Sequence, residues 1–228
     1  DLEVKRVSEA ATKPTRKLAY TTPNYKVENG TTLLETPEGD MPIEVFGAHN
    51  LNNLAGAKWI CQNMGVDEAD FYEAIASFKG ASKRLEKIAE SRTTVAYKDF
   101  AHSPSKVAAT TKAVKEQYQD RTLVACLELH TYSSLNSEFL KEYEGALAYA
   151  DVAVVFYSPD AVKIKQLEEV TYDQIAQAFN RKDLIIYTNP KDFKDYLFNL
   201  NLENSALLLM SSGNYGGLNF DEVKGLIQ

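Results

Sequence analysis

The sequence predicts an α/β fold in which a mostly parallel sheet is covered by helices on both sides. Three observations support this prediction. Five apolar runs of strand length follow one another in the second half of the chain, amphipathic helical patterns alternate with them, and polar turn residues separate the two. Continuous apolar strands that alternate with helices are typical of a sheet buried on both faces.

The first part of the chain has a different pattern, which is typical of hairpins. Its opening run, DLEVKRV, is strand-like, and four short alternating or β-branched runs follow it. The dipeptide Asn29-Gly30 between two of these runs is a strong hairpin signal. The four expected strands are Lys17–Thr21, Tyr25–Glu28, Thr31–Glu35 and Pro42–Phe46.

After Gly47 the apolar spacing changes to that of a helix. Apolar residues recur on one helical face from Leu51 onward, and Gly65 follows where a C-terminal glycine is expected. Asp67 is a suitable N-cap for a second helix over Glu68–Phe78. The next stretch, KGASKRLEKIAESR, is polar, and we expect a domain boundary near residue 90.

From residue 93 onward the pattern alternates between strand and helix. The clearest helix is Ser105–Tyr118, in which Val107, Thr111 and Val114 share one face. The expected strands are Thr94–Tyr97, Leu123–Leu129, Val152–Phe156, Leu184–Tyr187 and Ala206–Met210. The other expected helices are Ser137–Tyr149, Tyr172–Phe179, Lys191–Phe198 and Phe220–Ile227.

Composition narrows the class of protein. The 228 residues, 44% of them hydrophobic, can form a sizeable core, and no apolar run or leader sequence suggests a membrane protein or a secreted one. Cys61 and Cys126 fit reduced thiols in a cytoplasmic protein. A net charge of −7 argues against a general nucleic-acid surface but allows a local anion site. Because the chain starts at Asp1 rather than methionine, we expect it to be part of something longer.

Candidate chemistry follows the expected strands. In an open parallel sheet, ligands bind beyond the carboxyl ends of the strands, and the segments DFAHSPS, LHTYSS and SSGNYGG lie there. His102 and His130 belong to these segments, whereas His49 stands before the first long helix. Each histidine has an alternative interpretation as a structural residue next to a helix. Ser211–Gly217 is either an anion-binding nest of backbone N–H groups or a turn that needs positive φ.

Several familiar site motifs are absent from the sequence. No Cys/His spacing suits zinc, and neither a GxSxG nucleophile elbow nor a GxxxxGK[ST] phosphate loop occurs. A stand-alone nucleotide-binding oxidoreductase domain would need a glycine-rich loop after its first strand, and DFAHSPS is not one. The motifs alone indicate an α/β domain with a polar ligand-binding edge.

Four segments in order resemble the Mur ligase family. They are FGAHNLNNLAGA (Phe46–Ala57), FKGASKRLE (Phe78–Glu86), YKDFAHSPSKVAATTKAV (Tyr97–Val114) and the strand ending in LHTYSS. The resemblance implies that residues 1–90 are the last part of a central, ATP-binding domain with a β-hairpin and helices, and that residues 91–228 are a C-terminal Rossmann-like domain. The ending LLLMSSGNYGGL resembles the murein tripeptide ligase branch, to which the alanine-adding branch is nearest.

The resemblance also assigns expected roles to single residues. The adenine pocket would include His49, Asn50 and Asn53, because amides can pair with the adenine edge. Arg84 would reach ribose or phosphate oxygens, or else it is only a solvated charge in a polar run. Asp99 would accept hydrogen bonds from ribose hydroxyls, and His102 would be the catalytic histidine beside the acyl phosphate and the amine.

Two departures from the family pattern concern substrate binding. Ser103 stands where many relatives have a second histidine, and Thr131 and Ser134 stand where the alanine-adding ligases have arginines. Because hydroxyls cannot form a bidentate charged pair with a carboxylate, we expect a peptide rather than free alanine. The expected substrate-binding residues are Ser103, His130, Thr131, Ser134, Ser211, Ser212, Gly213 and Asn214.

The expected activity is that of an ATP-dependent ligase in peptidoglycan synthesis or recycling. It would join an amino acid or murein peptide to UDP-N-acetylmuramate through an acyl phosphate, with ATP and Mg²⁺ as cofactors of the longer parent protein. We expect no metal site in this chain, no cofactor bound to it alone, and no activity from it alone, because the phosphate loop and magnesium ligands would precede Asp1. The alternative is a non-catalytic Mur-like module that binds a nucleotide sugar or a partner; an intact upstream phosphate loop would favour the enzyme.

Overall fold

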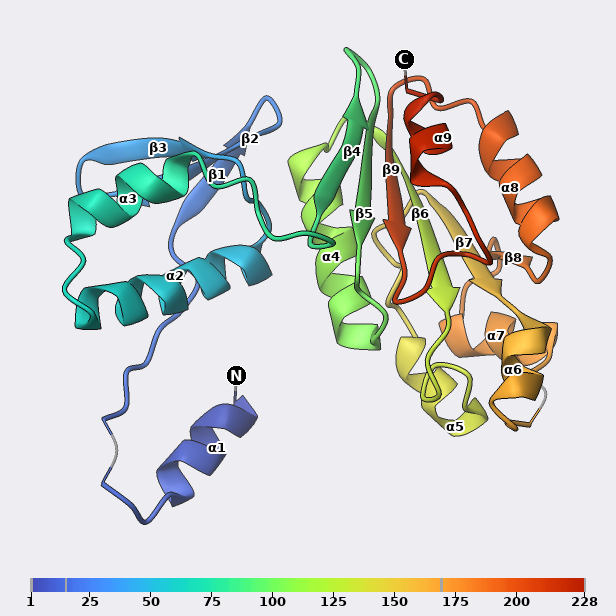
Figure 1. Cartoon of the computed structure of the whole chain (residues 1–228), viewed down its shortest axis with the longest axis horizontal. Coiled ribbons are helices and arrows are strands. Elements are labelled where there is room, and N and C mark those ends of the chain that lie inside the picture. The colour runs from blue at the N-terminus through green and yellow to red at the C-terminus, as the bar shows by residue number, and fades with distance from the viewer. Residues whose placement is uncertain (1, 15, 169, 228) are drawn as a thin grey trace.

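The computed structural model describes residues 2–14, 16–168 and 170–227. A small unit with a three-stranded sheet lies beside a large α/β unit, and helix α1 lies apart from both (Figure 1). The first elements are α1 (Leu2–Ala10), β1 (Tyr25–Glu28), β2 (Thr31–Thr36), β3 (Gly39–Ile43), α2 (Ala48–Asn63) and α3 (Glu68–Ala76). The large unit contains β4 (Glu86–Glu90), β5 (Val95–Asp99), α4 (Pro104–Gln117), β6 (Thr122–Leu129), α5 (Ser137–Leu140), the 3₁₀ helix η1 (Lys141–Tyr143), β7 (Val152–Tyr157), α6 (Pro159–Ile164), α7 (Tyr172–Phe179), β8 (Ile185–Tyr187), α8 (Pro190–Asn199), β9 (Ser205–Met210) and α9 (Phe220–Lys224).

The large sheet confirms the predicted fold class. Its strand order is β4-β5-β9-β6-β7-β8, and every pair is parallel except β4 with β5. Alternate residues of each central strand enter two separate apolar cores. Leu127 packs with residues of α4 and α7, while its neighbour Cys126 packs with residues of α8 and α9. The central strands are therefore largely apolar, because both faces of the sheet are covered.

The small unit is an antiparallel sheet with two helices. The predicted hairpin is confirmed, since β1 pairs with β2 through a turn in which Asn29 has φ 50° and Gly30 has φ 75°. Both central residues of such a turn need positive φ, which asparagine and glycine adopt at little cost. The core of this unit consists of Leu34, Ile43, Leu51, Leu54 and Phe71.

Three predictions about the first part of the chain are wrong. The described part of the opening run, from Leu2 onward, belongs to helix α1 (Leu2–Ala10) rather than to a strand, and no residue of this helix is buried. Lys17–Thr21 forms no strand. The strand expected at Pro42–Phe46 lies three residues earlier, at Gly39–Ile43, because Pro42 pairs with Leu33 and Gly39 closes a tight turn opposite Thr36. Turn geometry fixed this register, not the apolar pattern.

The second half differs from prediction at three elements. The polar stretch after Phe78 contains β4, an edge strand that is held by backbone pairing with β5 and needs no apolar run. The helix expected over Ser137–Tyr149 ends early, as α5 followed by η1, and Gly145 with φ 73° lies in the turns beyond it. Helix α6 was not expected. The domain boundary near residue 90 stays a prediction.

Aromatic rings pack against one another where the two units meet. The ring centroid of Phe46, which follows β3, lies 5.4 Å from that of Tyr97 in β5 and 6.4 Å from that of Tyr118 after α4. The hydroxyl groups of Tyr97 and Tyr118 are hydrogen-bonded to each other at 2.7 Å. Within the described ranges, no helix is long and apolar enough to cross a membrane.

Candidate functional site

Three polar loops meet at the carboxyl edge of the large sheet, as the sequence predicts. They follow β5, β9 and β6, which are neighbours in that order. The backbone N–H of Ser211 donates to the carbonyl of Asp99 at 2.9 Å, which joins the loops after β9 and β5. The N–H of Tyr215 donates to the carboxylate of Glu128 at 2.9 Å, which joins the loop after β9 to β6.

His102 is held by the backbone around it. Its Nδ1 lies 2.8 Å from the carbonyl oxygen of Phe100, and its own carbonyl accepts a hydrogen bond from the Tyr143 hydroxyl. Ser103 occupies the N-cap position of α4, but its side chain makes no capping bond and Pro104 starts the helix. The imidazole is thus fixed through one nitrogen, and the Ser103 hydroxyl is not used by the helix.

Asp99 has a structural role that the sequence did not indicate. The carboxylate is 7% exposed; Oδ2 accepts from the N–H of Leu85 at 2.7 Å and Oδ1 from that of Ala101 at 2.6 Å. These bonds attach the end of β5 to the segment that connects the two units. Each carboxylate oxygen has a second lone pair, so the group keeps capacity to accept bonds from a hydroxyl.

Arg84 and His102 both contact one aromatic ring, that of Phe100. The guanidinium carbon of Arg84 is 5.1 Å from the ring centroid of Phe100, and the imidazole of His102 is edge-on to the same ring at 5.1 Å. Arg84 is exposed, and within the described part of the chain its guanidinium makes a single hydrogen bond, to the carbonyl of Lys83 at 3.5 Å. Its remaining donors fit an anion such as phosphate. Phe100 was not among the predicted site residues, although the sequence shows an aromatic residue between Asp99 and Ala101.

The residues predicted for an adenine pocket are not all in one place. Burial lowers the pKa of His49, and the Asp99 carboxylate opposes that shift, so the imidazole is mainly neutral near the end of β5. The side-chain amide of Asn50 donates to the backbone carbonyl of Phe46 at 3.0 Å. Asn53 is exposed and lines another cavity, of about 560 Å³, together with Trp59 and other largely apolar residues.

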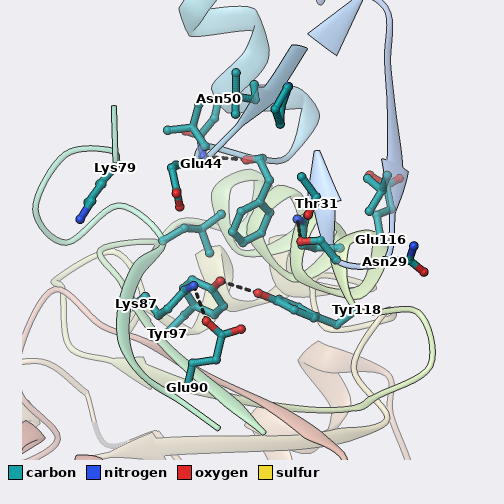
Figure 2. A pocket seen from close by; sticks show the side chains of 18 of the residues that line it. Asn29, Thr31, Glu44, Asn50, Lys79, Lys87, Glu90, Tyr97, Glu116 and Tyr118 are labelled. Carbon is teal, nitrogen blue, oxygen red and sulfur yellow. Dashed lines mark hydrogen bonds and ion pairs between the residues drawn. The ribbon is translucent and has the colours of Figure 1, made fainter. Parts of the chain in front are cut away.

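A cavity of about 1180 Å³ lies between the small sheet and the end of α4 (Figure 2). Of the predicted site residues, only Asn50 and Arg84 line it. Figure 2 shows that acidic and basic side chains share its wall, with the ammonium of Lys87 paired to Glu90 at 2.6 Å. Mixed charge gives no field that favours an anion, so we place the candidate site at the strand ends instead.

The side-chain hydrogen bonds of the loop after β6 are mostly internal to the loop. The Ser134 side chain is buried, and its Oγ accepts from the N–H of Thr131 at 2.9 Å. The hydroxyl of Thr131 is in turn 2.9 Å from Ser134 Oγ. The hydroxyls of both predicted substrate-binding residues are therefore engaged in hydrogen bonds within one turn. The neighbouring His130 is partly exposed.

The loop after β9 is held by its own hydrogen bonds and by Glu128. The N–H of Gly213 donates to Ser211 Oγ at 2.6 Å, and Asn214 is exposed with its Oδ1 accepting from the N–H of Gly217 at 3.2 Å. The Oγ of Ser212 is buried and has no hydrogen-bond partner in the described part of the chain. Among the same residues, no cluster of histidine, cysteine, aspartate and glutamate side chains could hold a metal ion.

Comparison with known proteins supplies the family. The family model described as "Mur ligase, glutamate ligase domain" matches residues 83–213, more than half of the chain. The UDP-N-acetylmuramate L-alanine ligase of Gloeothece citriformis is 29% identical over 213 residues, which cover 88% of this chain and 42% of that protein. The chain thus spans less than half the length of this relative.

Three solved structures have the same fold at low identity. The UDP-N-acetylmuramate-alanine ligase MurC of Thermotoga maritima matches 90% of this chain and 44% of its own, with TM-score 0.65 and 16% identity. The murein peptide ligase of Psychrobacter arcticus matches 87% and 42%, with TM-score 0.57 and 20% identity. A MurF ligase of Thermotoga maritima in complex with ADP matches 90% and 44%, with TM-score 0.56 and 16% identity. Together with the match of the family model, these similarities establish that the chain belongs to the Mur ligase family, of which it contains the C-terminal domain.

Proposed function

We propose that this chain works within an ATP-dependent ligase that joins an amino acid or a murein peptide to UDP-N-acetylmuramate. The observation that carries the proposal is the meeting of three polar loops at adjacent strand ends, with His102, His130 and Ser211 in them. The names of the relatives, which include alanine ligases and a murein peptide ligase, support the reaction class.

The proposed reaction has two steps. The carboxylate of UDP-N-acetylmuramate takes the γ-phosphoryl group of ATP, and ADP leaves. An amine then attacks the acyl phosphate carbonyl, and phosphate leaves as the amide forms. The first step needs charge neutralisation around the phosphates, and the second needs a deprotonated, oriented amine.

The side chains of this chain would bind and orient the reactants. The exposed guanidinium of Arg84 would contact phosphate oxygens, and Asp99 would accept a bond from ribose with its remaining lone pairs. The neutral imidazole of His49 would lie beside the nucleoside. His102 would help to place the phosphate or the amine. The proposal assigns Mg²⁺ and most phosphate contacts to segments that the longer relatives have in addition.

A peptide is the acceptor that we propose. Thr131 and Ser134 carry no charge and are hydrogen-bonded to each other, so neither can form an ion pair with the carboxylate of free alanine. Asn214, in the loop after β9, offers an exposed amide to a longer acceptor, and the buried hydroxyl of Ser212, which has no partner among the described residues, lies in the same loop.

The test is phosphate release by the full-length protein that contains this chain. Release should require both ATP and UDP-N-acetylmuramate and should be faster with murein tripeptide than with alanine, whereas the 228-residue chain alone should show no turnover. His102→Ala in the full-length protein should slow amide formation far more than it lowers the free energy of unfolding. Nucleotide-sugar binding without any phosphate release would instead establish a non-catalytic binding module.

A further inference from the structure

Glu128 is a buried carboxylate at the end of β6 that the sequence analysis did not single out. The residue is 3% exposed, and its Oε2 accepts hydrogen bonds from the backbone N–H of Tyr215 at 2.9 Å and from the Ser211 hydroxyl. A buried charge is costly unless it is hydrogen-bonded, so this carboxylate must be held by the loop after β9. One side chain thus ties the loop after β9 to the end of β6.

The other oxygen of the same carboxylate faces a histidine. Glu128 Oε1 lies 3.6 Å from Nδ1 of His130; the Glu128 side chain is 4% exposed and that of His130 is 42% exposed. The carboxylate therefore lies on the protein side of the imidazole, and the imidazole is open to solvent. The distance exceeds that of a hydrogen bond, but such contacts are often long without substrate and tighten when it binds.

A glycine makes this arrangement possible. A Cβ atom on Gly213 would lie 2.8 Å from Glu128 Oε2 and 3.0 Å from Cγ of His130. A Cβ atom this close to Oε2 would force the Glu128 carboxylate or the loop to move, so the present packing of the loop after β9 against the pair depends on glycine at this position.

We propose that Glu128 is a positioning residue that holds His130 with its proton on Nδ1, so that Nε2 of His130 takes the proton of the incoming amine. The proposal rests on the proposed function. A carboxylate next to one imidazole nitrogen fixes the tautomer and stabilises the imidazolium that forms when the other nitrogen accepts a proton. His102 differs in this respect, because its Nδ1 lies 2.8 Å from the neutral carbonyl of Phe100.

The step balances in protons and electrons. The ammonium group of the acceptor gives one proton to His130 Nε2, which leaves a neutral amine and an imidazolium paired with the Glu128 carboxylate. The amine lone pair forms the C–N bond, and the C–O bond to phosphate breaks with its electron pair going to phosphate. The amine nitrogen loses a second proton as the amide forms, and this proton goes to the departing phosphate. The partly exposed imidazolium of His130 then returns its proton to water.

The first test uses the 228-residue chain without ligands. Nitrogen-15 chemical shifts at pH 8 should show His130 with its proton on Nδ1 in the wild type, and Glu128→Gln should move the population towards the Nε2–H form. Glu138→Gln is a matched control, because this carboxylate is exposed and lies in α5, the first helix after β6. An Nε2–H form in the wild type, or an unchanged ratio in Glu128→Gln, overturns the proposal. If Glu128→Gln does not fold, Gly213→Ala must shift the same ratio by displacing the ring.

The second test separates the two steps in the full-length protein. Hydroxylamine traps the acyl phosphate formed from ATP and UDP-N-acetylmuramate, and amide formation with murein tripeptide reports the amine step. Glu128→Gln and His130→Gln should each slow the amine step by about 100-fold or more while trapping stays at the wild-type rate. Glu138→Gln should change neither.

The outcomes distinguish the two proposals. Trapped acyl phosphate together with wild-type amide formation in Glu128→Gln overturns the role of Glu128 and leaves the proposed function intact. No trapped product in the wild type overturns the proposed function and, with it, the proton transfer by His130. The tautomer measurement then still decides whether Glu128 positions the imidazole.

Discussion

The side chain of Gln117 is hydrogen-bonded to Thr32, which joins helix α4 to the small sheet. Thr32 Oγ1 donates to Gln117 Oε1 at 2.8 Å, and both residues are buried. The other end of the amide, Nε2, donates to the carbonyl of Gly30 at 2.5 Å. Because α4 begins just after His102, this contact sets the position of the His102 loop relative to the small unit.

Loss of the Gln117 amide should destabilise the chain. In Gln117→Ala the Thr32 hydroxyl and the Gly30 carbonyl lose their partner in a buried place, which costs about 1–3 kcal/mol in the free energy of unfolding. Urea unfolding followed by circular dichroism measures the change. Gln119→Ala is the control, because Gln119 is exposed and bonds only at 3.4 Å to Glu116. Equal stability of the two variants would contradict the role of Gln117.

Gly47 should tolerate a methyl group less well than Gly39. Both have positive φ, 86° and 119°, so both alanine variants carry backbone strain. A Cβ on Gly47 would also lie 2.4 Å from Cβ of Ala113, whereas a Cβ on Gly39 would meet nothing within 4 Å. We expect Gly47→Ala to lose about 1–3 kcal/mol more than Gly39→Ala in urea unfolding, as overpacking does. In a double-mutant cycle, Ala113→Gly should recover part of that excess; strictly additive effects would exclude the contact.

His49 should make stability depend on pH around neutrality. Its folded-state pKa lies below the ordinary value of 6.5, because burial disfavours the charged imidazole. As pH falls, His49 is therefore protonated in the unfolded state before it is protonated in the folded state. The free energy of unfolding that is present above pH 6.5 is lost as pH falls through the lower pKa of the folded state. Urea midpoints at pH 7.5 and 5.5 should differ less in His49→Gln than in the wild type. An NMR titration of His49 with a midpoint at or above 6.5 would refute this.

The two cysteines should react at very different rates. Cys126 is fully buried in β6, and burial raises the pKa of its thiol to about 12, while Cys61 in α2 is partly exposed. Because the thiolate is the reactive form, a disulfide reagent at pH 8 should modify one thiol rapidly and the second only on unfolding. Cys61→Ser should abolish the rapid phase. Rapid modification that persists in this variant would show that β6 opens in the native state. Both cysteines are free thiols, as predicted.

Local pattern predicted most elements of the large unit. The helix over Tyr172–Phe179 has the predicted bounds, and α4 begins and ends within one residue of prediction. These elements are amphipathic or wholly apolar, so the spacing of their apolar residues predicts which face is buried. β4 was missed because an edge strand depends on backbone pairing, and its residues Glu86, Lys87 and Glu90 carry charges.

The candidate site was predicted in part. The sequence indicated that His102 and His130 follow strands, but the insertion of β9 between β5 and β6 is what brings their loops together with Ser211. Glu128 left a readable signal, a charged residue in the apolar run CLELH, which the analysis passed over. The turn in which Thr131 and Ser134 are hydrogen-bonded to each other left no such signal. The hydrogen-bond partner of a hydroxyl group cannot be deduced from the spacing of residues in the sequence.

The sequence by itself determined the alternation of strands and helices, the Asn29-Gly30 hairpin and the family. Those properties depend on which residues are buried at a regular spacing and on matched motifs, and both are local in the chain. Only the tertiary structure decided that Glu128 lies behind His130 and that Gln117 joins α4 to Thr32. Contacts between distant segments depend on the order in which the chain crosses the sheet, and no local pattern records that order.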